Sequence, residues 1–172
     1  NRKITREYIS SVLEHFGKGD LILLQNEISN IDFAMEEAKK RGLQVAFNPS
    51  PADEGVFLCN LELVDYFILN EVEGRILAGT DSEEPAPILK ALREKYKNAA
   101  FVLTLGDQGA WYCDPEETSF QDIFRVEAVD TTAAGDTFCG ICAETVADKA
   151  ECHVHSCRNA GRGIKFSVVH PA

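Results

Sequence analysis

The segment from Val129 to Gly140, VDTTAAGDTFCG, places small residues directly ahead of an aspartate and a predicted helix. A helix begins with about four backbone N–H groups that have no partner within the helix. The small side chains of Ala133, Ala134 and Gly135 would leave these donors open to an incoming anion. We therefore expect an anion hole, suited to a phosphoryl group, at the start of this helix.

Asp136 follows the expected anion hole and falls in the first predicted helical turn. A carboxylate at that position can simply offset the helix dipole, a contribution of about 0.3–1 kcal/mol. Beside a bound phosphoryl group it can also hold a hydroxyl, and the pair would then suit phosphoryl transfer to an alcohol. The spacing alone leaves both interpretations open.

Short apolar runs alternate with helical patterns ahead of this loop, which predicts βαβ units and a mainly parallel sheet. Ligands of such sheets bind beyond the carboxyl ends of the strands, which is where the loop of residues 130–136 is expected. The runs that suit buried strands are residues 20–25, 44–48, 65–70 and 100–106, and the helical patterns are residues 5–17, 30–42 and 85–96.

The pattern changes after Gly106. Residues 110–113 are expected to form an antiparallel return strand, and residues 120–129 an extended segment. Two helices, at about residues 134–147 and 152–166, are expected to finish the chain. One three-layer, Rossmann-like α/β domain over residues 1–172 is the simplest account of this order.

The composition excludes several function classes. The chain has 28 acidic and 17 basic residues, a net charge of -11, which repels nucleic acids and anionic lipids. No apolar stretch approaches the ~20 residues that span a bilayer, and the first residues do not resemble a signal peptide. The 6 cysteines stand mostly in apolar or helical contexts, which favours reduced thiols. We expect a cytoplasmic protein without nucleic-acid or membrane partners.

The segment DTTAAGDTFCG closely resembles the second signature of the ribokinase-like (pfkB-type) carbohydrate kinases. Segments at residues 23–28, 48–52, 70–79 and 103–112, namely LLQNEI, NPSPA, NEVEGRILAG and LTLGDQGAWY, recur in that family in the same order. The resemblance implies a ribokinase-like fold and an enzyme, a transferase that moves a phosphoryl group from ATP to a sugar hydroxyl with Mg²⁺. It makes Asp136 the catalytic base and the backbone of residues 133–135 the phosphoryl-binding element.

The resemblance also assigns the N-x-x-E motif, Asn70 and Glu73, to Mg²⁺ and its water shell near the ATP phosphates. Mg²⁺ prefers oxygen ligands and retains several waters, which fits these residue types. Without the family, a strand-ending asparagine followed by a solvated helical glutamate is the simpler interpretation.

The nucleotide itself is assigned to a loop and a helix. The family runs the loop that contains Thr104, Gly106 and Gly109 along the phosphates and the ribose, and it places the position of Asn159 near the adenine. From the residues alone, a tight turn and a solvated helical asparagine remain alternatives.

Many members of the family bind a monovalent cation such as K⁺ behind the anion hole, and Asp130 and the carbonyl of Thr132 match two of its ligands. The remaining ligands come from a later segment with a glycine before an alanine, whereas this chain reads SVVHPA. The resemblance therefore implies at most an incomplete potassium site.

The resemblance covers the ATP-binding and catalytic-base portion of the family pattern. The sugar-binding N-terminal portion and its lid, which often mediates homodimers, have no counterpart here. A second function class, a nucleotide-binding or interaction module without catalysis, therefore stays open.

A zinc site is a further alternative, because cysteine and histidine are common zinc ligands. Buried thiols and a polar helix start explain the same residues more simply. The candidate ligands are Cys139, Cys142, Cys152, His153, His155 and Cys157.

Overall fold

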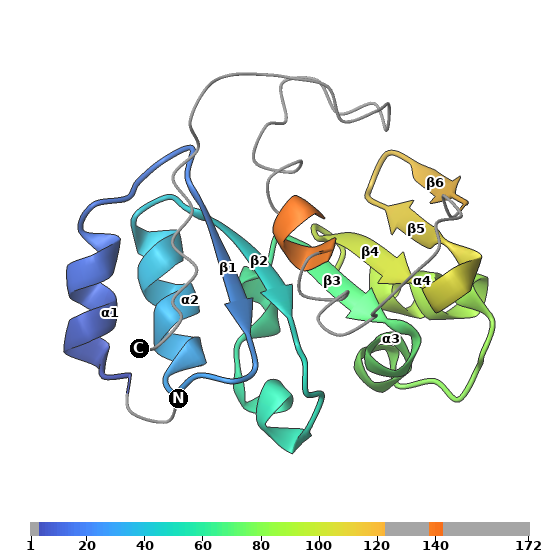
Figure 1. The fold of residues 1–172 in the computed structure, drawn as a ribbon, viewed down its shortest axis with the longest axis horizontal. Helices are drawn as coiled ribbons and strands as arrows, with labels where there is room; N and C mark the ends of the chain where they lie inside the picture. Colours follow the sequence, from blue (N-terminus) through green and yellow to red (C-terminus); the bar gives the residue numbers. More distant parts are fainter. Residues whose placement is uncertain (1–3, 123–137, 143–172) are drawn as a thin grey trace, which may run out of the picture.

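Strands and helices alternate along residues 4–122 and 138–142, the part of the chain that the computed structural model describes (Figure 1). Residues 138–142 are helical, and three short 3-10 turns interrupt the connections: η1 (Glu54–Leu58), η2 (Leu61–Leu63) and η3 (Gly106–Gln108). The main elements are α1 (Arg6–Leu13), β1 (Leu21–Gln25), α2 (Ile31–Lys40), β2 (Gln44–Asn48), β3 (Tyr66–Asn70), α3 (Glu71–Ala78), α4 (Pro85–Lys95), β4 (Ala100–Thr104), β5 (Ala110–Cys113) and β6 (Thr118–Gln121).

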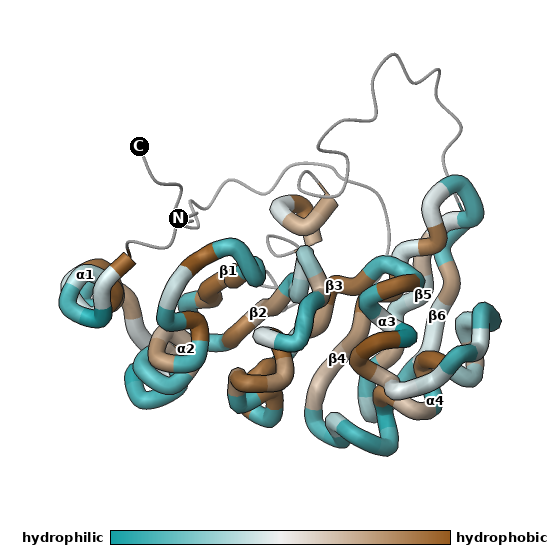
Figure 2. Tube along the Cα trace, turned by 90° about the horizontal axis from the view of Figure 1, so that it is seen from below, coloured by the Kyte–Doolittle hydropathy of each residue, from teal (hydrophilic) through white to brown (hydrophobic). Residues whose placement is uncertain are grey.

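The six strands lie side by side in sequence order. β1 to β4 are parallel, and β5 and β6 return as an antiparallel hairpin, as the sequence predicts for residues 110–113. Because each parallel strand lies beside its predecessor, crossovers of one hand place their helices on the same face of the sheet. Figure 2 shows α2, α3 and α4 together on one face.

The helix of residues 138–142 lies over β3 on the opposite face (Figures 1 and 2). It falls within the helix expected at residues 134–147; the rest of that helix and the helix expected at 152–166 lie outside the described residues. The extended segment expected at 120–129 begins earlier, with β6 at Thr118, and its part from residue 123 onward lies outside the described residues. The α/β fold with a mainly parallel sheet is confirmed.

The core fills the space between the sheet and the helix layer. Phe47, Phe67 and Phe101 are fully buried there, and the rings of Phe67 and Phe101 stack with centroids 5.5 Å apart. Among the residues described, no helix combines the length and the apolarity that a bilayer crossing needs.

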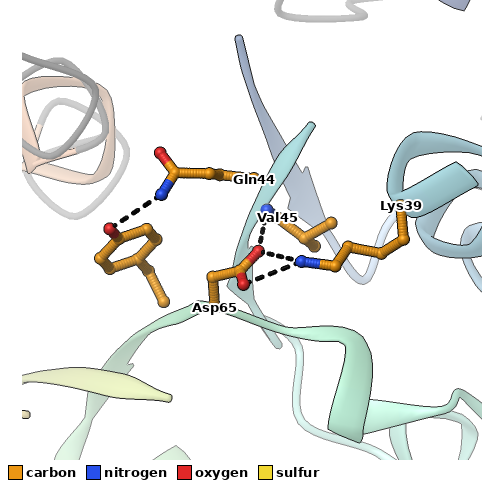
Figure 3. Close-up of polar contacts among 5 residues, drawn as sticks. Lys39, Gln44, Val45 and Asp65 are labelled. Atoms are coloured by element: carbon orange, nitrogen blue, oxygen red, sulfur yellow. Dashed lines mark hydrogen bonds and ion pairs between the residues drawn. The ribbon is translucent and has the colours of Figure 1, made fainter. Parts of the chain in front are cut away.

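Polar residues at the amino ends of the strands hold the layers together (Figure 3). The Asp65 carboxylate accepts hydrogen bonds from Lys39 Nζ at 2.7 and 2.8 Å and from the backbone N–H of Val45 at 2.7 Å. Gln44 Nε2 donates to the Tyr66 hydroxyl at 3.2 Å, and burial raises the pKa of that phenol. The polar groups at the amino ends of these strands therefore join α2, β2 and β3.

Candidate functional site

Each of the four parallel strands ends in a polar residue. Leu24, Phe47, Leu69 and Leu103 belong to the core beneath the helices, so the residue after each of them points to the other face of the sheet. That is the face over which residues 138–142 lie. The four strand-ending residues are Gln25, Asn48, Asn70 and Thr104.

Asn70 and Glu73 form a capping box at the start of α3. The Asn70 side-chain oxygen accepts a hydrogen bond from the Glu73 backbone N–H at 2.9 Å, and Glu73 Oε2 accepts one from the Asn70 N–H at 3.0 Å. This pairing satisfies two donors that a helix start leaves open. The Glu73 side chain is buried, with 4% of the residue exposed, so the interpretation as a solvated helical glutamate is wrong.

A second donor reaches the same carboxylate from β2. Asn48, itself buried, places Nδ2 at 3.4 Å from Glu73 Oε2 and donates to the Ile68 carbonyl at 2.8 Å. Asn48 Oδ1 accepts from Gln25 Nε2 at 3.3 Å. Three elements thus meet in one hydrogen-bonded group, Gln25–Asn48–Glu73. Sequence reasoning missed Gln25 and Asn48 as site residues, although each is a polar residue that ends an apolar run.

The Thr104 hydroxyl makes a hydrogen bond within the sheet, because it donates to the Leu69 carbonyl at 3.2 Å. Gly106 and Gly109, in the loop that follows, differ in their surroundings. Gly106 has a φ of +57°, and a Cβ built there meets no atom of the described residues within 4 Å. Gly109 has a φ of +103°, and a Cβ there would lie 2.2 Å from the Gln121 carbonyl oxygen. Gly106 borders open space, whereas Gly109 is packed against β6.

Several predicted site residues lie outside the described residues, so their assignments stay predictions. They are Asp130, Thr132, Ala133, Ala134, Gly135, Asp136 and Asn159.

The zinc alternative gains no support within the described residues, where no group of three or more histidine, cysteine, aspartate or glutamate side chains could hold a metal ion. Cys139 is buried in the helix of residues 138–142, and Cys142 is half-buried. The other candidate ligands, at residues 152–157, lie outside the described residues.

A groove of about 670 Å³ runs between α4 and the β5–β6 hairpin. Its walls carry opposite charges, with Lys90 and Arg93 on α4 and Glu116 and Glu117 on the hairpin. It lies on the helix-covered face and receives none of the described site residues predicted from sequence. The carboxyl ends of β1 to β4, which we call the carboxyl edge of the sheet, are therefore the candidate site, and this groove is not.

Comparisons with known proteins show which family the chain resembles. The profile of the pfkB family carbohydrate kinases matches residues 12–155. A deoxyribokinase from Salmonella typhi is 33% identical over 144 residues, which cover 81% of this chain and 47% of that protein. The solved ribokinase of Thermotoga maritima is 32% identical with a TM-score of 0.68 and covers 86% of this chain and 49% of its own. A solved fructokinase from Vibrio cholerae O395, 24% identical, shares the fold with a TM-score of 0.64 over 78% of this chain and 48% of its own. The chain spans about half the length of each.

Proposed function

The chain belongs to the pfkB family of carbohydrate kinases, and we propose from this that it carries the ATP-binding and catalytic part of a phosphotransferase that acts on a sugar hydroxyl. One observation carries the proposal beyond the family match: the polar strand ends and Glu73 gather at the carboxyl edge of the parallel sheet. That edge is where α/β sheets bind ligands. We propose that residues 1–172 form a single domain of a cytoplasmic enzyme.

The residues present fit Mg²⁺ held through water. Glu73 Oε1 accepts no hydrogen bond from the described residues, and the exposed Asn70 side chain has its Nδ2 unused there. A carboxylate oxygen and an amide can hold waters of a hydrated Mg²⁺. When bound, the ion would offset the negative charge of the nucleotide phosphates.

The remaining proposed roles concern the nucleotide, the transferring phosphoryl group, the catalytic base and the cation. In the proposal, Gly106 lets the nucleotide phosphates approach the backbone after β4, beside Thr104, and Asn159 lies near the adenine. The amides of Ala133, Ala134 and Gly135 stabilise the transferring phosphoryl group. Asp136 takes the proton of the attacking sugar hydroxyl. Asp130 and the Thr132 carbonyl contribute to a potassium site.

A second candidate is a nucleotide-binding module without turnover. It needs the same nucleotide contacts but no sugar hydroxyl, so the strand-ending polar residues and Glu73 support it as well. For the kinase candidate the partners are ATP and a small sugar, and the whole enzyme would form a homodimer. For the module candidate the nucleotide is the partner. In both cases the net charge of -11 disfavours nucleic acid.

Calorimetry with ADP and Mg²⁺, joined to an ADP-release assay with ribose, deoxyribose and fructose, separates the two candidates. Binding with sugar-dependent ADP release supports the kinase. Binding without release for every sugar supports the module for this chain. If the folded chain binds neither ATP nor ADP, both candidates are wrong.

We expect Gly106→Ala to weaken ADP binding by about 10-fold, equivalent to about 1.4 kcal/mol. The reason is that the added methyl group would occupy the open space where the phosphates approach the backbone. Calorimetry measures the affinity.

Gly79→Ala is the matched control, since Gly79 has a φ of +70° at the end of α3 and a Cβ there also meets none of the described atoms within 4 Å. Both variants should lose about 1–2 kcal/mol of stability from the left-handed backbone. Equal ADP affinities for the two variants would remove Gly106 from the nucleotide site.

A further inference from the structure

We infer that Asn48, held by Gln25, is a positioning residue that sets the direction of the Glu73 carboxylate toward the proposed metal site. The inference rests on the proposed function, which gives Glu73 its partner, the hydrated Mg²⁺. The contacts that carry it come from β1, β2 and α3, whose meeting point is the carboxyl edge of the sheet.

The capping box alone holds Glu73 at one point, the hydrogen bond from the Asn70 N–H to Oε2. Rotation of the carboxylate about that bond would leave the cap intact. Asn48 Nδ2 approaches the same oxygen from β2, at 3.4 Å, so a second contact restricts the rotation of the carboxylate. Because both donors meet Oε2, the other oxygen is left to face a ligand. Oε1 accepts no hydrogen bond from the described residues.

The Asn48 amide has one possible orientation. Its Nδ2 donates to the Ile68 carbonyl at 2.8 Å, and only the nitrogen end of an amide can do this. The oxygen end therefore points to Gln25, whose Nε2 donates to it at 3.3 Å. Aspartate would place a second carboxylate against both the Ile68 carbonyl and Glu73, and an apolar residue would offer no donor. The chemistry of the position thus requires a side-chain amide.

Side chains that orient metal-binding groups typically change metal affinity by about 10–100-fold when they are removed. We expect Asn48→Ala to reduce the Mg²⁺-dependent gain in ADP affinity by about 10-fold, and Gln25→Ala to reduce it by about 3-fold, since Gln25 acts through Asn48. ADP affinity without Mg²⁺ should stay within about twofold of the wild-type value in both variants, because Glu73 would act on the nucleotide through the ion. Calorimetry of the full chain, with and without Mg²⁺, measures both quantities.

Gln44→Ala is the matched control. Gln44 begins the strand that Asn48 ends, and it too donates from a side-chain amide, to the Tyr66 hydroxyl at 3.2 Å (Figure 3). It lies at the opposite edge of the sheet, so the Mg²⁺-dependent gain should be unchanged. An Asn48→Ala chain that keeps the full gain overturns the inference and leaves the proposed function standing.

A second measurement needs no nucleotide. In a double-mutant cycle of Asn48→Ala and Glu73→Gln, urea unfolding should be non-additive. We expect the combined rise in the unfolding constant to fall short of the product of the single rises by about 5-fold. Multiplicative effects would show that Asn48 does not hold Glu73. If the wild-type chain binds no ADP, the proposed function is refuted, and this cycle still decides whether the two side chains are coupled.

Discussion

Asp136→Asn is expected to lower sugar phosphorylation by about 10²–10⁴-fold, the usual contribution of a positioned base. The substitution keeps the size of the side chain and removes the group that accepts the proton of the sugar hydroxyl. ATP affinity should stay within about twofold, because the proposed role of the Asp136 side chain is toward the sugar hydroxyl and the backbone amides of the same loop are unchanged. Coupled ADP release measures turnover, and calorimetry measures affinity.

Asp32→Asn separates this role from the dipole interpretation. Asp32 is an exposed aspartate in the first turn of α2, and nothing in the proposal gives it a part in catalysis. Asp32→Asn removes a negative charge from the first turn of α2, which costs about 0.3–1 kcal/mol, and Asp136→Asn would cost as much at the predicted start of its helix. If Asp136→Asn behaves like Asp32→Asn, with normal turnover and slightly lower stability, the residue offsets the helix dipole and another group is the base.

The sequence predicts the strands of this fold closely, because a parallel strand that is buried on both faces appears in the sequence as a continuous apolar run. The run at residues 44–48 is β2 without correction, and those at 65–70 and 100–106 are trimmed to Tyr66–Asn70 and Ala100–Thr104. The connection from β2 to β3 was less predictable. It forms two 3-10 turns, η1 and η2, because short 3-10 segments depend on local caps such as Asp53 and Asn60 and not on a long periodic pattern.

The N-x-x-E motif shows why the site was harder to predict than the fold. Sequence reasoning weighed a metal role for Asn70 and Glu73 against a solvated pair, and the structure shows a capping box with a buried glutamate. The spacing contains the capping box, since asparagine and glutamate three residues apart are its signature. It does not contain the third member, Asn48, which lies 25 residues before Glu73 and meets it only because β2 pairs with β3, the strand that leads into α3.

Gly109→Ala should destabilise the chain by about 3 kcal/mol. At φ +103° and ψ −150°, Gly109 occupies a backbone region that is essentially restricted to glycine, and a forced residue there costs about 1–3 kcal/mol. The new Cβ would also lie 2.2 Å from the Gln121 carbonyl oxygen, so β6 would have to move, with a typical overpacking cost of about 1–3 kcal/mol. Urea unfolding followed by circular dichroism measures the loss.

Gly106→Ala tests whether the stability loss of Gly109→Ala comes from the contact with the hairpin or from the loop itself. The two glycines stand three residues apart in one loop, and only Gly109 is packed against the backbone of β6. Leu105 N donates to the Gly109 carbonyl at 2.9 Å, so a shift at Gly109 also opens the loop beside the proposed phosphate site. We therefore expect Gly109→Ala to lose ADP affinity together with about 3 kcal/mol of stability, and Gly106→Ala to lose ADP affinity with only the smaller stability cost of a left-handed alanine. A Gly109→Ala chain as stable as Gly106→Ala would mean that β6 adjusts without cost, and the rigid hairpin would no longer explain how the loop keeps its shape.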